Sequence, residues 1–166
     1  MPEELHVVRP HHSPIRRVVD PERRLPDIAL IENNQLTDAY TKMHKPHSVH
    51  GYEIATRDGF AGWMAVVEDT DSDACYFANI ELDENYLRSK QGIGLAAYVL
   101  AIETAHAVGR RFRTGQTVSE PAKHRWEGFV DLGVAQVHEL FEYLGNLREG
   151  SAYSHYLAHV DIPPLT

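Results

Sequence analysis

The sequence predicts an α+β fold built on a largely antiparallel sheet, and three observations carry this prediction. Three strand-like segments follow one another near the middle of the 166-residue chain, separated by short polar turns. Consecutive strands joined by tight turns form an antiparallel meander. Directly afterwards, apolar residues recur at helical spacing over a long segment. Two further strand-like segments close the chain and complete the pattern.

Residues 1–27 are expected to form an arm ahead of a single domain at residues 28–166. Prolines at positions 10, 14, 21 and 26 interrupt every helix that this segment could form, and its charges are mixed. We expect the arm to pack on the domain or on a second subunit, which suggests a homodimer.

The first half of the domain holds the predicted meander. A strand, a helix, a proline-containing loop and three strands are expected in this order, at residues 28–32, 36–43, 44–50, 52–56, 60–67 and 75–82. The dipeptide Asp58-Gly59 and the polar run at residues 69–73 supply the two turns of the meander.

The second half begins with the long helix. A helix, a short strand, a second helix and two closing strands are expected, at residues 95–108, 111–114, 119–132, 134–143 and 153–160. Gly109 ends the first helix. Ser119 is the expected N-cap of the second helix, Pro121 lies in its first turn, and Gly133 ends it.

The turn between the third strand and the long helix contains Gln91-Gly92-Ile93-Gly94. The first amides of a helix have no partner within it, and the helix dipole is positive at this end. Glycines let a phosphate approach the backbone closely. A strand, a glycine turn and a helix start therefore predict an anion-binding site for a phosphorylated cofactor.

Composition excludes several classes of protein. The chain is 43% hydrophobic and 24% charged, as is usual for a soluble globular domain. No apolar run approaches the roughly 20 residues that cross a bilayer, and the acidic N-terminus does not resemble a secretory signal. The single cysteine, Cys75, excludes an internal disulfide and fits a reducing compartment. We therefore expect a cytoplasmic protein without a membrane partner.

The net charge is −8, but the charges are unevenly distributed. Residues 88–125 carry seven bases and two acids, whereas the other residues beyond position 50 carry two bases and fifteen acids. The basic block is either solvated surface or the place of an anionic cofactor, with a cationic acceptor facing the acidic remainder. No basic face dominates, so nucleic acid is not an expected partner.

The order of elements and the glycine turn resemble the GNAT superfamily of acyl-CoA-dependent N-acyltransferases. The resemblance covers residues 52–143 and rests on Gln91-Gly92-Ile93-Gly94-Leu95-Ala96-Ala97, Gly109, Ser119, Ala122, Trp126 and Leu132-Gly133-Val134-Ala135. It implies a mixed, largely antiparallel central sheet of six or seven strands, flanked by helices on both faces. It also implies transfer of an acetyl group from acetyl-CoA to a primary amine by direct attack.

The resemblance further implies a set of cofactor-binding residues. Amides of the loop from Gln91 to Ala96, which includes Gly92, Ile93, Gly94 and Leu95, would hold the coenzyme A diphosphate. Pantetheine would follow the strand from Ala78 to Leu82, where a backbone amide polarises the thioester carbonyl. Arg88 or Lys90 would reach the phosphates, and Arg110, Arg111 and Arg113 are further possible phosphate partners.

Two positions depart from the family pattern. The Gln/Arg position of the signature falls on Ser89, with Arg88 one residue early. Many family members place a tyrosine in the second helix as general acid for the departing thiolate, but the matching residue here is Trp126. Indole does not donate a proton usefully at neutral pH. Either another tyrosine acts as the acid, or the thiolate leaves without help.

A base must take the proton of the acceptor amine. Glu81 is the leading candidate because the family often places its base at this strand end, and Glu84 is a weaker one. Tyr143, Tyr153 and Tyr156 lie in the closing hairpin and could act as acid or could simply pack. His50 and His138 could also titrate as a base.

The 11 histidines suggest a metal site, but their spacing does not support one. Pro46 breaks any helix through His44, His47 and His50. His155 and His159 lie four apart on a predicted strand, where such positions are about 13 Å apart. We therefore expect no metal.

The acidic body favours a small cationic amine as acceptor. An acceptor on a protein or an aminoacyl-tRNA is the alternative within the enzyme class. A non-catalytic acyl-CoA-binding or interaction module with the same fold is the alternative outside it, supported by Trp126 and by the shifted signature.

Overall fold

The computed structural model describes residues 7–8, 13–85, 92–145 and 153–165. Its strands are β1 (Val7–Val8), β2 (Ala29–Glu32), β3 (Ser48–Thr56), β4 (Gly59–Glu68), β5 (Ala74–Leu82), β6 (Arg111–Arg113), β7 (Thr117–Ser119), β8 (Gln136–Gly145) and β9 (His155–Ile162). Its helices are α1 (Pro14–Val19), α2 (Asn34–Met43), α4 (Ile93–Ala107) and α5 (Glu120–Asp131).

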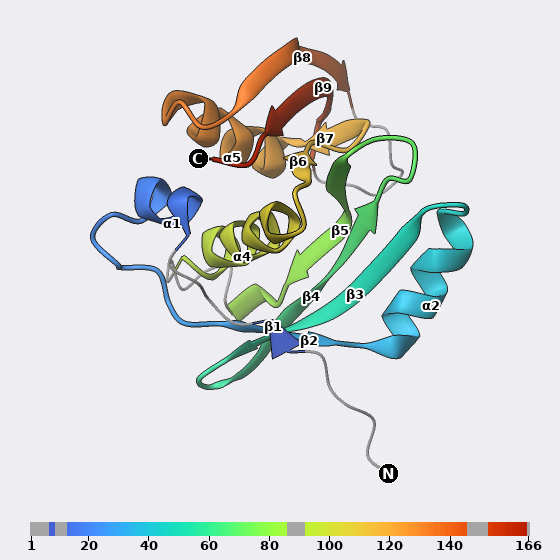
Figure 1. Cartoon of the computed structure of the whole chain (residues 1–166), viewed down its shortest axis with the longest axis vertical. Coiled ribbons are helices and arrows are strands. Elements are labelled where there is room, and N and C mark those ends of the chain that lie inside the picture. Colours follow the sequence, from blue (N-terminus) through green and yellow to red (C-terminus); the bar gives the residue numbers. More distant parts are fainter. Residues whose placement is uncertain (1–6, 9–12, 86–91, 146–152, 166) are drawn as a thin grey trace.

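The described strands form one mixed sheet in the spatial order β1-β2-β3-β4-β5-β6-β9-β7, with β8 paired to β9 (Figure 1). All pairs are antiparallel except β5 with β6. The predicted α+β fold with a mixed, largely antiparallel sheet is therefore confirmed. The expected six or seven strands omitted β1 and β7, which have two and three residues.

Helices cover both faces of the sheet, as expected (Figure 1). On one face, α1, α4 and α5 bury the main core, whose largest fully buried side chains include Phe112, Phe129 and Leu100. On the other face, α2 covers a smaller apolar cluster, in which Tyr40 packs against Val49. Because α4 is apolar on nearly all sides, ten of its fifteen residues are buried.

The meander of β3, β4 and β5 is confirmed, with one irregularity that the sequence did not predict. Ala65 pairs with Asn79 and Val66 pairs with Phe77, which leaves Ala78 as an extra residue in β5. Such a β-bulge bends the strand and leaves the extra residue outside the regular ladder. The bulge therefore lies in the segment along which pantetheine was expected.

The sheet opens between β5 and the next strands. Among the described residues, β6 pairs with β5 only through Ala74–Arg111 and Cys75–Phe112. After Arg113 the chain follows β9 instead, because β7 pairs with β9 from Thr117 to Ser119. The edge of β5 from Phe77 to Leu82 consequently faces a gap without a described strand partner.

Thr114 holds the chain on β9 at the point where the gap begins. Its amide donates to the Val160 carbonyl at 2.9 Å, and its hydroxyl donates to the Ala158 carbonyl at 3.2 Å. The same hydroxyl accepts from the Val160 amide at 3.1 Å. Thr114 is only 2% exposed, so these bonds are shielded from water.

The expectation that prolines interrupt every helix in residues 1–27 was wrong. Pro14 begins α1, where its missing N–H costs nothing, and the Ser13 side chain caps the helix by accepting from the Arg16 amide at 3.2 Å. Ile15 is fully buried, and Arg16 Nε donates to Glu103 Oε1 of α4 at 3.1 Å. This part of the arm therefore packs on the domain.

Two boundaries differ from expectation in smaller ways. The loop expected at residues 44–50 is shorter, because β3 already begins at Ser48. Ser119 is the N-cap of α5 as predicted, but its side chain makes no capping hydrogen bond.

No helix in the described part of the chain has both the length and the apolar character that crossing a membrane requires.

Candidate functional site

The glycine turn opens α4 as predicted. Gly92 is the N-cap residue and has φ +80°, a left-handed conformation that suits glycine. The helix geometry leaves the amides of Ile93, Gly94 and Leu95 without a partner inside α4. The expected set included Ala96, but its amide donates to the Gly92 carbonyl at 2.9 Å and is not available for a ligand. The helix amides available to an anion therefore end at Leu95.

Arg125 of α5 lies beside this helix start. A Cβ added to Gly94 would lie 3.3 Å from Arg125 Nη2 and 3.4 Å from Leu82 Cδ1. The guanidinium lies over the Tyr98 ring, 5.8 Å from its centroid. No carboxylate of a described residue pairs with it, and burial lowers the pKa of the Arg125 guanidinium while Tyr98 opposes this shift.

Sequence reasoning counted Arg125 in the basic block but did not single it out. The sequence feature that could have singled out Arg125 is its place in the second helix, one residue before Trp126. Its meeting with Gly94 depends on the packing of α5 against α4, which spacing along the chain does not give. An uncompensated cation beside unpaired helix amides makes this corner attractive to an anion.

The other predicted phosphate partners are placed differently. Arg88, Lys90 and Gln91 lie outside the described residues. The guanidinium groups of Arg111 and Arg113 pair with carboxylates, at 3.2 Å from Asp161 and 3.3 Å from Asp69. Arg110 lies beside them and donates to the Asp69 and Ser72 carbonyls. These three arginines gather at the opposite end of β5 from Gly92, because β6 pairs with the start of β5.

A cavity of about 160 Å³ occupies the gap between β5 and β7 on the α4 and α5 side of the sheet. We call it the α4-side cavity. Its lining residues are Phe77, Ala78, Asn79, Ile80, Tyr98, Arg113, Thr114, Gly115, Thr117, Val118, Ser119, Ala122, Trp126 and His155. The unpaired edge of β5 forms one wall, so its backbone amides and carbonyls can meet a bound chain.

A larger cavity of about 950 Å³ opens on the α2 side, and we call it the α2-side cavity. Its walls come from the C-cap of α2, the start of β5, and the β8–β9 hairpin. Charged and titratable side chains line it, namely His44, Asp69, Asp73, Tyr76, Arg111, Arg113, His138, Glu139, His159 and Asp161. The four carboxylates outnumber the two guanidinium groups, so the cavity is acidic.

The two cavities meet at the gap in the sheet. Both are lined by Phe77, Ala78, Arg113, Gly115 and Thr117. A Cβ added to Gly115 would lie 3.7 Å from the Phe77 carbonyl oxygen, so this loop approaches β5 closely. A ligand entering from the helix side and a ligand entering from the α2 side could therefore contact each other near the bulge at Ala78.

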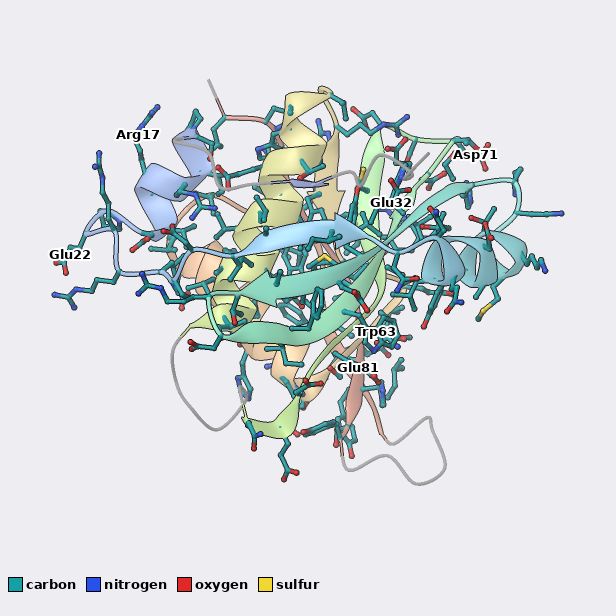
Figure 2. The ribbon with its side chains drawn as sticks, turned by 90° about the horizontal axis from the view of Figure 1, so that it is seen from below. Arg17, Glu22, Glu32, Trp63, Asp71 and Glu81 are labelled. Atoms are coloured by element: carbon teal, nitrogen blue, oxygen red, sulfur yellow. The ribbon has the colours of Figure 1, made fainter. Side chains whose placement is uncertain are left out.

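The predicted catalytic residues do not line either cavity. Glu81 is exposed on β5 and lies opposite Trp63 of β4, and Figure 2 shows the two side chains on the same part of the sheet. Glu84 is exposed just after β5. Tyr143 of β8 is 66% exposed and packs edge-on against Tyr156 at 5.6 Å between centroids. Their catalytic roles stay predictions.

Three side chains of the β8–β9 hairpin converge at the wall of the α2-side cavity. His138, His159 and Asp161 present ligand atoms within 4.8 Å of one another. His138 Nε2 lies 3.0 Å from Asp161 Oδ2, which also accepts from Arg111 Nη1 at 3.2 Å. These residues could hold a divalent cation, but the Arg111 guanidinium already supplies positive charge to the carboxylate.

The spacing of histidines could not reveal this cluster. His138 and His159 come together through the β8–β9 pairing, which has a register shift next to His138. His155 and His159, four apart on β9, instead line different cavities. His50 lies elsewhere and contacts Glu68, with 3.1 Å between Nε2 and Oε1.

Trp126 occupies the expected tyrosine position without exposing a polar group. It is 2% exposed and stacks on Phe112, with 6.0 Å between ring centroids. Trp126 and Tyr98 therefore give the α4-side cavity an aromatic wall on the helix side. Burial raises the pKa of Tyr98 to about 12, with a small opposing effect of Arg125.

Comparison with known proteins rests on structure alone, because no family model and no curated protein matches this chain. The ribosomal L7/L12 α-N-protein acetyltransferase RimL is 11% identical, with a TM-score of 0.59 over 97% of this chain and 100% of that one. A Bacillus subtilis acetyltransferase solved with CoA is 15% identical, with a TM-score of 0.53 over 98% and 100%.

A third similar structure is the spermidine N-acetyltransferase of Vibrio cholerae, solved with CoA and spermine. It is 12% identical, with a TM-score of 0.54 over 79% of this chain and 75% of that one. Such low identities establish a common architecture. The chain has the fold of the GNAT acetyltransferases.

Proposed function

We propose that this protein is an N-acetyltransferase that moves an acetyl group from acetyl-CoA to a primary amine of a small, cationic acceptor. The observation that carries the proposal is the meeting of two cavities at an opened sheet. The α4-side cavity borders α4 and α5, and the α2-side cavity borders α2. The two cavities share residues on both sides of the gap. Direct transfer between two ligands needs this arrangement, because the reacting atoms must approach to about 3–3.5 Å.

The acyl donor belongs on the helix side. The amides of Ile93, Gly94 and Leu95 and the guanidinium of Arg125 would hold the diphosphate. From there the pantetheine arm would run past Leu82 along the unpaired edge of β5 toward Ala78. A backbone amide at this edge would donate to the thioester carbonyl and stabilise the negative charge that develops on its oxygen.

The acceptor belongs in the α2-side cavity. Its excess of carboxylates favours a cation, and Glu139 has no ion-pair partner among the described residues. The amine must be neutral when it attacks, so a nearby group has to take a proton. Its nitrogen then bonds to the thioester carbon, the carbon–sulfur bond breaks, and its second proton leaves to give the amide.

The similar structures leave the class of acceptor open. One is an enzyme for spermidine, and others act on ribosomal proteins, including the ribosomal-protein-S18-alanine N-acetyltransferase of Escherichia coli. A protein or aminoacyl-tRNA acceptor would need a basic groove. The α2-side cavity is acidic instead, which favours the small cationic amine.

The function is tested by thiol release from acetyl-CoA in the presence of a panel of amines. We expect saturable release with polyamines or other small cationic amines, and rates that fall as salt screens the acidic cavity. Peptides with free N-termini and aminoacyl-tRNA serve as rival acceptors. Tight coenzyme A binding without thiol release for any acceptor would instead support a non-catalytic module.

Arg125→Gln tests where the phosphates bind. Hydrogen bonds to charged groups contribute about 1.5–3 kcal/mol, so we expect coenzyme A affinity to fall about 10- to 100-fold in calorimetric titration. For dephospho-CoA, which keeps the diphosphate, the affinity should fall by the same factor from the wild type to the Arg125 variant. Acetyl-pantetheine has no phosphate, so the wild type and the variant should bind it equally weakly. Gly92→Glu is a less specific probe, since φ +80° strains any side chain.

The matched control for Arg125 is Arg57→Gln, which removes an exposed arginine outside both cavities. It should leave coenzyme A affinity unchanged. Equal affinities of the Arg125 variant and the wild type would contradict the assignment of the phosphates to this corner.

Glu81→Gln and His138→Gln distinguish two possible bases. Glu81 follows from the resemblance, while His138 lines the acceptor cavity and is oriented by Asp161, as bases of catalytic triads are. We expect His138→Gln to lower kcat/KM at neutral pH about 100-fold and Glu81→Gln to change it less than threefold. The reverse order would assign the base to Glu81.

A further inference from the structure

His155 is a buried polar residue that has no role in the acetyl transfer described so far. It lies at the start of β9, opposite Ser119 of β7 and Gly145 of β8, and it is 8% exposed. Its Nδ1 atom is buried and has no hydrogen-bond partner among the described residues. Buried polar atoms of this kind are rare in folded proteins, because an unmade hydrogen bond costs about 1–3 kcal/mol.

His155 borders the space in which the proposed acyl donor would end. His155 lines the α4-side cavity together with Ala122 and Trp126 of α5 and the unpaired edge of β5. This is the space assigned above to the end of pantetheine and its thioester. The sulfur would thus lie in a cavity that the His155 side chain lines.

We propose that His155 is the general acid that protonates the departing coenzyme A thiolate. This inference rests on the proposed acetyl transfer. The amine nitrogen bonds to the acetyl carbon, and the carbon–sulfur bond breaks with its electron pair on sulfur. The His155 imidazolium gives a ring proton to that sulfur, so free thiol leaves and neutral imidazole remains. The proton released by the amine goes to the base, and His155 is reprotonated from solvent.

The chemistry of the cavity favours His155 over its neighbours. An imidazolium is a stronger acid than a thiol, so the transfer is downhill. The other titratable groups lining this cavity among the described residues are Tyr98 on α4 and Arg113 on β6. Burial raises the pKa of Tyr98 to about 12, and Arg113 is ion-paired with Asp69. The Trp126 indole at the usual tyrosine position is not an acid.

His155→Gln tests the proposal, with His124→Gln as the matched control. Gln keeps a hydrogen-bonding side chain but cannot titrate, and His124 is an exposed histidine of α5 outside both cavities. With acetyl-CoA and the best amine of the panel, we expect kcat of His155→Gln to fall about 100-fold, while the affinity for coenzyme A changes less than threefold.

The pH profile separates an acid from a merely structural residue. The acid form is lost as pH rises, so wild-type kcat should fall at high pH, and this falling limb should be absent in His155→Gln. Retention of wild-type kcat, or an unchanged limb, would overturn the proposal. A common loss of kcat and coenzyme A affinity, with a lower melting temperature, would also overturn it in favour of packing.

The assay also keeps this inference distinct from the proposed function. If the wild type released no thiol with any amine, the acetyltransferase proposal itself would fail. If the wild type and His124→Gln were active and His155→Gln matched them, only the role of His155 would fail.

Discussion

The structure depends on a change of partner in the sheet. After two residue pairs with β5, the chain of β6 and β7 stays hydrogen-bonded to β9, and the buried Thr114 bonds hold it there. The backbone of β5 from Phe77 onward is left at an open edge, with a bulge at Ala78. Unpaired backbone groups beside a cavity are costly unless a ligand or water satisfies them. The opened sheet therefore offers the backbone edge on which the proposed donor site depends.

The gap also separates two electrostatic environments. On the helix side, the positive end of α4 and Arg125, which has no carboxylate partner in the described part of the chain, favour an anion. On the α2 side, carboxylates and histidines favour a cation that must lose a proton before it reacts. Under the proposed function, a phosphorylated acyl donor and an amine acceptor would be drawn to opposite faces and would not compete for one pocket.

Much of the secondary structure was predictable from the local sequence. The meander, the long helix after the glycine turn and the closing hairpin follow from periodicity and turn residues. Helix α1 was missed because Pro14 was taken as a helix breaker, although it occupies the first turn. The bulge at Ala78 has no local signal, since it appears only when β5 is paired with β4.

The side chains of the site were harder to predict than the fold. Arg125 meets Gly94 only through the packing of α5 against α4, and His138 meets Asp161 only through the irregular register of the β8–β9 hairpin. His155 and His159 show the limit of periodicity, because an irregular hairpin places them on different cavities. The same packing leaves Glu81 and Tyr143 outside both cavities, although their positions near strand ends had suggested catalytic roles.

Hydrogen exchange measured with and without coenzyme A tests the central claim most directly. If the coenzyme fills the gap, the amides of residues 77–82 and of Ile93, Gly94 and Leu95 should exchange more slowly in the complex. The amides of β3, which pair on both sides within the sheet, should be unaffected. Protection confined to the α2-side cavity, or none along β5, would contradict the claim that the opened sheet is the donor site.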